Sequence, residues 1–168
     1  SQLDLLPYSL PVIEWALRWL EKNCPIEQSQ SLCHGDFRNG NLLVHKKRLT
    51  GIIDWEFTHI GNPLEDIGWF CARCWRFDND KEEAGGIGQL SDFMESYETT
   101  NPQQVNWLEL PYWKIVATVQ WALIAHRQGL RDSWNSTRKL ELALTGFKGV
   151  QLEHEILKLI KNHEGVKI

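Results

Sequence analysis

Two short apolar runs separated by a polar turn most limit the folds open to this chain. Leu42–Val44 and Leu49–Ile53 flank the turn His45–Arg48, which is a pattern typical of a β-hairpin. On both sides of this hairpin, apolar residues recur at helical spacing instead. The sequence therefore predicts an α+β fold that is mainly helical, with a small hairpin inserted between helices. We expect residues 1–168 to form a single domain.

Apolar periodicity places the helices before and after the hairpin. The first is expected over Pro7–Asn23, with Pro25 just beyond its end. The acidic, glycine-containing segment Asp78–Gly88 is expected to be a loop. The later helices are expected at Leu64–Trp75, Gln89–Glu98, Val105–Arg127 and Thr137–His163.

Charge and hydropathy exclude two classes of partner. The net charge is -4 and the basic residues are scattered, so the sequence offers no stripe that would follow nucleic-acid phosphates. No uninterrupted apolar run approaches the roughly 18 residues that a membrane-spanning helix needs. We therefore expect neither a nucleic acid polymer nor a membrane as a partner.

The four cysteines suggest a reducing, cytoplasmic setting. They contain only one closely spaced pair, Cys71 and Cys74, and a chain of this length can bury a core without disulfide bonds. That pair could form a redox or zinc site. With Trp69, Phe70 and Trp75 around it, however, we favour small core residues.

Three oxygen-bearing side chains, Asp36, Asn41 and Asp54, lie on loops that flank the strand pair. A hairpin would bring them together. Phosphoryl transfer needs a carboxylate for the acceptor hydroxyl and oxygen ligands for Mg²⁺ on the nucleotide. Asp36 and Asn41 have the Asp-x-x-x-x-Asn spacing of kinase catalytic loops, and Asp54 follows a strand as the second metal ligand of kinases does. Taken singly, each of these residues could instead cap a turn.

Three motifs in order carry a resemblance to a known family. They are His34-Gly35-Asp36 through Asn41-Leu42-Leu43-Val44, then Gly51 to Glu56, then Gly61-Asn62-Pro63-Leu64-Glu65-Asp66. This arrangement resembles the aminoglycoside phosphotransferase family, a branch of the protein-kinase-like fold. The segment Asp66–Phe77 further resembles the branch found beside acyl-CoA dehydrogenases. The resemblance covers most of the chain and weakens beyond about Tyr97.

The resemblance implies roles for single residues and for the cofactors. Asp36 would be the catalytic base, while Asn41 and Asp54 would bind Mg²⁺ on ATP. His34 would brace the loop, and Asp66 would be a buried anchor that accepts hydrogen bonds from the backbone of that loop. The partners would be a nucleotide and a hydroxylated small molecule, whose identity the sequence does not give.

Trp55 is assigned a structural role from its position. It follows the expected metal ligand Asp54, and we expect it to pack beneath the loop and fix that residue. His34 together with Asp36 could alternatively bind a metal. No other histidine-rich cluster lies near them in sequence, which makes this alternative weaker.

The family's nucleotide-binding N-terminal lobe has no counterpart in these residues. There is no glycine-rich loop followed by a strand lysine, and Gly85-Gly86-Ile87-Gly88 follows the catalytic loop instead of opening a βαβ unit. We therefore expect the chain to be the C-terminal, catalytic and substrate lobe of an ATP-dependent O-phosphotransferase. The N-terminal lobe would belong to the same protein, and the isolated chain would be nearly inactive.

Other functions remain open at this point. The chain could be a kinase-like binding or scaffold module without activity, or a metal-dependent hydrolase built on the same carboxylates. The acidic segment Asp78–Gly88, together with Trp113, Trp121 or Trp134, could attract a cationic substrate. A solvated loop and core packing are the simpler explanations.

Overall fold

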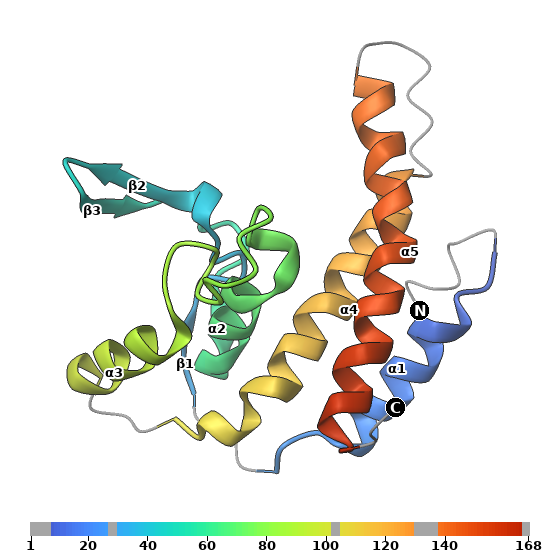
Figure 1. Ribbon diagram of the computed structural model, residues 1–168, viewed down its shortest axis with the longest axis horizontal. Coiled ribbons are helices and arrows are strands. Elements are labelled where there is room, and N and C mark those ends of the chain that lie inside the picture. The colour runs from blue at the N-terminus through green and yellow to red at the C-terminus, as the bar shows by residue number, and fades with distance from the viewer. Residues whose placement is uncertain (1–7, 27–29, 102–104, 130–137, 166–168) are drawn as a thin grey trace. The chain divides into compact units, whose positions relative to one another are not determined.

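The computed structural model describes residues 8–26, 30–101, 105–129 and 138–165. It confirms an α+β fold that is mainly helical (Figure 1). The chain divides into two compact units, residues 25–114 and residues 1–24 with 115–168. The regular elements are α1 (Pro11–Lys22), β1 (Ser31–Cys33), β2 (Leu42–His45), β3 (Arg48–Ile52), β4 (His59–Gly61), α2 (Pro63–Cys71), α3 (Leu90–Thr100), α4 (Leu110–Gly129) and α5 (Arg138–His163), with short 3₁₀ turns at η2 (Asn39–Asn41), η3 (Arg73–Trp75) and η4 (Trp107–Glu109).

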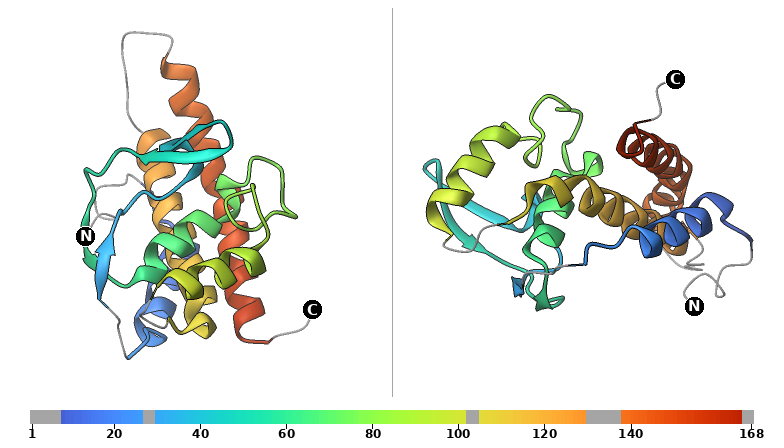
Figure 2. Two further views of the ribbon diagram at one scale, coloured as in Figure 1. Left: turned by 90° about the vertical axis from the view of Figure 1, so that its left-hand side faces the viewer. Right: turned by 90° about the horizontal axis from the view of Figure 1, so that it is seen from below.

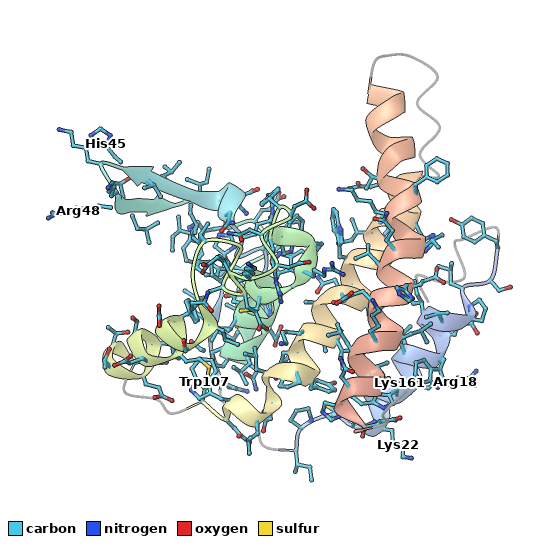
Figure 3. All side chains as sticks on the ribbon, viewed as in Figure 1. Arg18, Lys22, His45, Arg48, Trp107 and Lys161 are labelled. Carbon is cyan, nitrogen blue, oxygen red and sulfur yellow. The ribbon has the colours of Figure 1, made fainter. Side chains whose placement is uncertain are left out.

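The expected hairpin is confirmed as the antiparallel pair β2–β3. Its register runs from Leu42 opposite Ile52 to His45 opposite Arg48. The two turn residues, Lys46 and Lys47, both have positive φ angles of 47° and 63°, which is the geometry of the tight turns that match strand twist. His45 and Arg48 project from the tip of this hairpin (Figure 3).

A second strand pair was missed by the sequence analysis. Ser31–Cys33 forms β1, which pairs antiparallel with β4, so that Leu32 lies opposite Ile60. Each strand has only three residues, and both Leu32 and Ile60 are exposed. The alternation of buried and exposed residues that reveals a longer strand is therefore absent.

Helix α2 begins with a complete capping box and ends earlier than expected. The Asn62 side chain accepts from the N–H of Leu64 at 2.9 Å, and Glu65 accepts from the N–H of Asn62 at 2.9 Å. The expected continuation to Trp75 is wrong. Ala72 adopts extended angles (φ -61°, ψ 138°), and a 3₁₀ turn over Arg73–Trp75 replaces the rest of the helix.

The unit of residues 25–114 is packed around α2, which contacts β1. Leu64, Ile67 and Phe70 of α2 are buried. Gly68 allows the helix to approach the first turns of α4 closely, because an added Cβ would lie 2.7 Å from the Trp113 carbonyl carbon. This core holds the loops on either side of α2 in place.

The other unit contains α1, the later part of α4 and α5. Ile13, Ala16 and Trp19 of α1 are buried, while Trp15 is 43% exposed. The Trp19 indole donates to Glu164 at 2.8 Å, near the end of α5. Figure 2 shows the three helices from two further directions. The core positions contributed by α4 and α5 are Ile115, Ala117, Val119, Ala122, Ala125, Leu152, Ile156 and Ile160.

Helices α1 and α4 begin later in the sequence than predicted, and each begins at or next to a proline. Helix α1 begins at Pro11, and residues 8–10 before it are not helical, while the expected start at Pro7 lies outside the described residues. Helix α4 begins at Leu110, one residue before Pro111. Proline suits the first turn of a helix because its missing N–H would have no helical partner there. Within the described residues, no helix is both long and apolar enough to cross a bilayer.

Candidate functional site

Four hydrogen bonds hold the side chain of Asp36 on the loop that precedes β2. The Arg38 Nε lies 3.1 Å from Oδ1 and 3.0 Å from Oδ2. The Trp69 indole N–H donates to Oδ1 at 2.9 Å, and the Asn41 amide donates to Oδ2 at 2.8 Å. The carboxylate is therefore held in one orientation by donors from its own loop and from α2.

Asn41 is the buried partner of Asp36. Its amide nitrogen also donates to the Asp36 backbone carbonyl at 2.8 Å, and its side chain is 3% exposed. Because the nitrogen is committed to Asp36, the amide oxygen is directed away from that residue. The Asn41 carbonyl in turn accepts from the N–H of Ile53 at 3.0 Å, which ties this loop to the end of the hairpin.

Asp54 follows the hairpin by two residues. It lies next to Ile53, whose N–H binds the Asn41 carbonyl, so the structure places the backbones of Asn41 and Asp54 close together. Asp54 has a φ of 70°, a left-handed conformation that aspartate tolerates better than most residues. Its side chain is exposed, and it forms no hydrogen bond or ion pair with the described part of the chain.

His34 connects the two loops through both nitrogens of its ring. Nδ1 accepts from the N–H of Asp36 at 3.1 Å, so Nδ1 carries no proton. Nε2 therefore carries the proton and donates to the Ile53 carbonyl at 2.9 Å. The ring is buried. These contacts are those of a brace between the Asp36 loop and the strand that leads to Asp54.

Trp55 lies against His34 and remains partly open to solvent. The ring centroids are 4.6 Å apart, and the Trp55 indole donates to the Ile52 carbonyl at 2.8 Å. The side chain is 46% exposed. Trp55 thus covers the His34 ring and closes the turn after β3.

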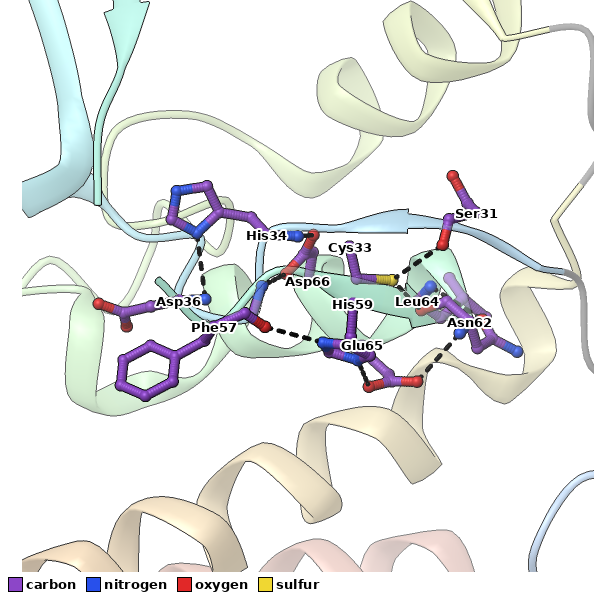
Figure 4. Close-up of polar contacts among 11 residues, drawn as sticks. Ser31, Cys33, His34, Asp36, Phe57, His59, Asn62, Leu64, Glu65 and Asp66 are labelled. Atoms are coloured by element: carbon purple, nitrogen blue, oxygen red, sulfur yellow. Dashed lines mark hydrogen bonds and ion pairs between the residues drawn. The ribbon is translucent and has the colours of Figure 1, made fainter. Parts of the chain in front are cut away.

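Asp66, in the first turn of α2, accepts hydrogen bonds from two successive backbone N–H groups (Figure 4). Oδ2 accepts from His34 at 2.6 Å and Oδ1 from Gly35 at 2.9 Å. Asp66 is partly buried, where a buried anchor was expected. Gly35 has a φ of 82°, and an added Cβ would lie 2.6 Å from the Phe57 carbonyl oxygen. The loop therefore requires glycine at this position.

His59 joins the segment after Asp54 to the cap of α2 (Figure 4). Its Nδ1 lies 3.0 Å from the Phe57 carbonyl and its Nε2 lies 3.1 Å from Glu65 Oε2. Both partners are acceptors, so the geometry suits the doubly protonated ring. The hydrogen bond to the Phe57 carbonyl, followed by that to Glu65, raises the pKa of His59 above its ordinary 6.5.

The two buried thiols are structural. Burial raises the pKa of Cys33 to about 11 and that of Cys71 to about 12. Cys33 Sγ donates to the Asn62 carbonyl at 3.3 Å beneath the start of α2. Cys71 lies in the buried face of α2. Both remain protonated near neutral pH, so neither is poised as a nucleophile.

Two acidic side chains of the segment after α2, Asp80 and Glu83, are paired with basic side chains. Arg73 binds Asp80 at 2.7 Å, and Lys114 binds Glu83 at 2.6 Å. The Arg73 guanidinium lowers the pKa of Asp80. This pairing leaves less charge for a cationic substrate. Of the tryptophans considered for a cation–π wall, Trp113 is buried and Trp134 lies outside the described residues.

Sequence reasoning missed two residues of the site, Arg38 and Trp69. Arg38 lies two positions after Asp36, a signal that could have been noticed. Trp69 is 33 positions away, and only the fold brings its indole to the carboxylate. No group of three or more His, Cys, Asp or Glu side chains in the described residues could hold a metal. A metal here would therefore depend on few protein oxygens, as Mg²⁺ on nucleotide phosphates does.

Comparison with solved structures supports the kinase-like fold. A protein described as an aminoglycoside phosphotransferase from Ralstonia eutropha superposes with a TM-score of 0.75 at 23% identity, over 96% of this chain and 52% of that one. A thermostable mutant of the aminoglycoside phosphotransferase APH(4)-Ia gives a TM-score of 0.57 at 18% identity, over 94% of this chain and 45% of that one.

The sequence relatives are acyl-CoA dehydrogenase family proteins, which matches the branch of the family expected from the sequence. Acyl-CoA dehydrogenase family member 11 of Pongo abelii is 30% identical over 144 residues, which is 76% of this chain and 18% of that protein. The probable acyl-CoA dehydrogenase IBR3 of Arabidopsis thaliana is 46% identical over 59 residues, 32% of this chain and 7% of that protein. The chain thus spans less than a fifth of these relatives. Residues 1–108 match the model of the phosphotransferase enzyme family, and the chain therefore belongs to that family.

Proposed function

We propose that this chain is the catalytic lobe of an ATP-dependent O-phosphotransferase that acts on a hydroxylated small molecule. One observation carries the proposal: Asn41 holds Asp36 through two hydrogen bonds of 2.8 Å. This contact orients a carboxylate and, at the same time, leaves the Asn41 amide oxygen unused by Asp36 and available to a cation. A base beside a metal-ligand oxygen is what transfer to a hydroxyl needs.

In the proposed reaction, Asp36 orients the acceptor hydroxyl and receives its proton. The acceptor oxygen forms a bond to the terminal phosphorus of ATP. The bond from that phosphorus to the bridging oxygen breaks, and ADP leaves with its electron pair. The donors from Trp69 and Asn41 keep Asp36 directed at the hydroxyl throughout.

Asn41 and Asp54 are the residues proposed to hold Mg²⁺. Both offer oxygen atoms, which hard cations prefer, and their backbones meet at the end of the hairpin. When bound, Mg²⁺ would neutralise charge on the nucleotide phosphates. The exposure of Asp54 leaves its carboxylate accessible from solvent. His34, Asp66 and Trp55 would support these residues without touching substrate.

Most of the contacts that bind ATP are proposed to come from an N-terminal lobe of the same protein. These 168 residues carry no glycine-rich loop followed by a strand lysine. Asn41 and Asp54 alone would bind MgATP weakly, so we expect little activity from the chain by itself. A cytoplasmic location would suit the free cysteines, because disulfide bonds are rare under reducing conditions.

The test is a substrate screen with the full-length protein. MgATP is incubated with a panel of hydroxylated small molecules, and both ADP and the phosphorylated product are detected by mass spectrometry. We expect ADP formation to depend on an acceptor and to be lost in Asp36→Ala. Phosphate release without any acceptor would point to a hydrolase. Absence of both turnover and MgATP binding would favour an inactive binding or scaffold module.

A further inference from the structure

The β2–β3 hairpin projects from the unit of residues 25–114 and carries a cluster of basic side chains at its tip (Figures 1 and 3). His45, Lys46, Lys47 and Arg48 follow one another there, and all four are exposed. None of the four side chains forms a hydrogen bond or an ion pair with the described part of the chain. The fold therefore leaves these positive charges available to a partner.

No acidic residue of the hairpin neutralises this tip. The segment Leu42–Ile53 contains neither aspartate nor glutamate. The next acidic residue along the chain is Asp54, and the strand length between it and Arg48 is roughly 15–20 Å. Charges are screened over about 8 Å at physiological salt. The tip is thus a local positive charge, although the whole chain carries a net charge of -4.

An exposed aliphatic pair lies directly behind the basic tip. Val44 and Leu49 are cross-strand partners, next to the pair formed by His45 and Arg48. They are 65% and 57% exposed, and cross-strand partners share one face of a hairpin. In the part of the chain that the structure describes, β2 and β3 pair only with each other. Apolar surface therefore follows the charges at a distance of about 3 Å along the strands.

A lipid surface with anionic head groups offers a partner to both features. Each Lys or Arg close to such a surface strengthens binding by about fivefold. Apolar side chains of segments that lie on a membrane enter the boundary between head groups and acyl chains by about 5–10 Å. A nucleic acid or a purely acidic peptide would pair with the cations but leave Val44 and Leu49 in water. The combination therefore favours lipid.

We propose that the hairpin tip binds an anionic lipid surface, with Lys46, Lys47 and Arg48 at the phosphates and Val44 and Leu49 at the acyl boundary. From the sequence we expected no membrane as a partner, because no apolar run is long enough to cross a bilayer and the basic residues are scattered. A surface contact needs no spanning run, and one short cluster is sufficient where a projecting hairpin places it foremost. Lipid binding at the tip does not depend on the proposed phosphotransferase function.

The test measures binding of the full-length protein to lipid vesicles by flotation. One set of vesicles is phosphatidylcholine alone, and in the other about 30% of the lipid is phosphatidylserine. We expect wild type to bind the anionic vesicles and to be released as salt rises, because salt shortens the screening length. Lys46→Asn with Lys47→Gly should weaken this binding by about tenfold to thirtyfold. Asn-Gly is preferred where both turn residues have positive φ, so this variant keeps the hairpin, as circular dichroism should confirm.

Two further variants separate the tip from the charge of the whole chain and lipid from other anions. Arg18→Gln with Lys22→Gln removes the same charge from exposed positions of α1 and should bind as wild type does. Val44→Thr with Leu49→Thr keeps residues that suit strands but should weaken binding by about threefold to tenfold. Equal binding of wild type to both kinds of vesicle, or equal losses in the tip and α1 variants, would overturn the proposal. So would unchanged binding of the threonine variant, since the tip would then attract anions without entering lipid.

Discussion

The side-chain amide of Asn41 donates to both the backbone carbonyl and the carboxylate of Asp36, at 2.8 Å in each case. One asparagine therefore fixes the main chain and the side chain of the proposed base. Its own carbonyl is bonded to Ile53, so the same residue also links the base to the segment that carries Asp54. This double role makes the site one cooperative unit, in which removal of one member disturbs the others.

Replacement of Asp36 tests the proposed base. In the full-length protein, Asp36→Asn should lower kcat by at least about a hundredfold, because the amide cannot accept the hydroxyl proton. MgATP binding should change little. Initial rates measure kcat, and calorimetry measures MgATP binding. Asp92→Asn, an exposed position on α3, is the control for loss of a negative charge. A kcat within a few fold of wild type in Asp36→Asn would show that another group is the base.

Replacement of Asp54 tests the proposed metal ligand. Asp54→Asn removes the charge but suits the left-handed conformation at φ 70°, so the backbone should be preserved. We expect MgATP affinity to fall by about tenfold or more and the Mg²⁺ concentration needed for half-maximal activity to rise. Magnesium titrations of both proteins give this comparison. If Asp54→Asn needs the same Mg²⁺ concentration as wild type, Asp54 is not a ligand of the metal.

Replacement of Asp66 tests the anchor of the loop. Asp66→Ala leaves the N–H groups of His34 and Gly35 without their acceptor, and we expect a loss of about 1–3 kcal/mol in the free energy of unfolding. Urea denaturation measures it. Glu95→Gln, at an exposed position of α3, is the control and should change stability by less than about 0.5 kcal/mol. Equal stability of both variants would contradict the anchoring role.

The hairpin and the Asp36–Asn41 spacing could be predicted because both are local. Two short apolar runs and the polar turn between them are visible along the chain, as is a fixed separation in a loop. The β1–β4 pair could not be predicted, since residues with exposed side chains such as Leu32 and Ile60 give no pattern. The indole of Trp69 reaches Asp36 from 33 positions away, which depends on how α2 packs and not on any motif.

Gly35 tests whether the loop needs its left-handed backbone. Gly35→Ala places a Cβ 2.6 Å from the Phe57 carbonyl oxygen at a φ of 82°. The conformation alone costs about 1–2 kcal/mol for an L-residue, and the close contact adds to this loss of stability. Gly88→Ala is the matched control, because an added Cβ there meets no atom within 4 Å. Urea denaturation of the two variants should separate them clearly, and similar midpoints would contradict the assigned strain.

The ring of His59 should make the free energy of unfolding fall as the pH rises. Its pKa in the folded protein lies above the ordinary 6.5, first through the Phe57 carbonyl and then through Glu65. The folded state therefore holds the proton more tightly than the unfolded chain. Its contribution to stability is complete below about pH 6.5 and is lost as pH rises through the raised pKa. The His59 side chain is 45% exposed, so solvent screening keeps the effect small.

An NMR titration of the imidazole should give a midpoint for His59 above 6.5. Glu65→Gln should lower that midpoint, since it removes the carboxylate that faces Nε2. In urea denaturation, His59→Gln should remove part of the stability that wild type loses as the pH rises above the ordinary pKa of 6.5. His45→Gln, at the hairpin tip, is the control for loss of a histidine. A His59 midpoint at or below 6.5 would mean that the ring does not bridge Phe57 and Glu65 in solution.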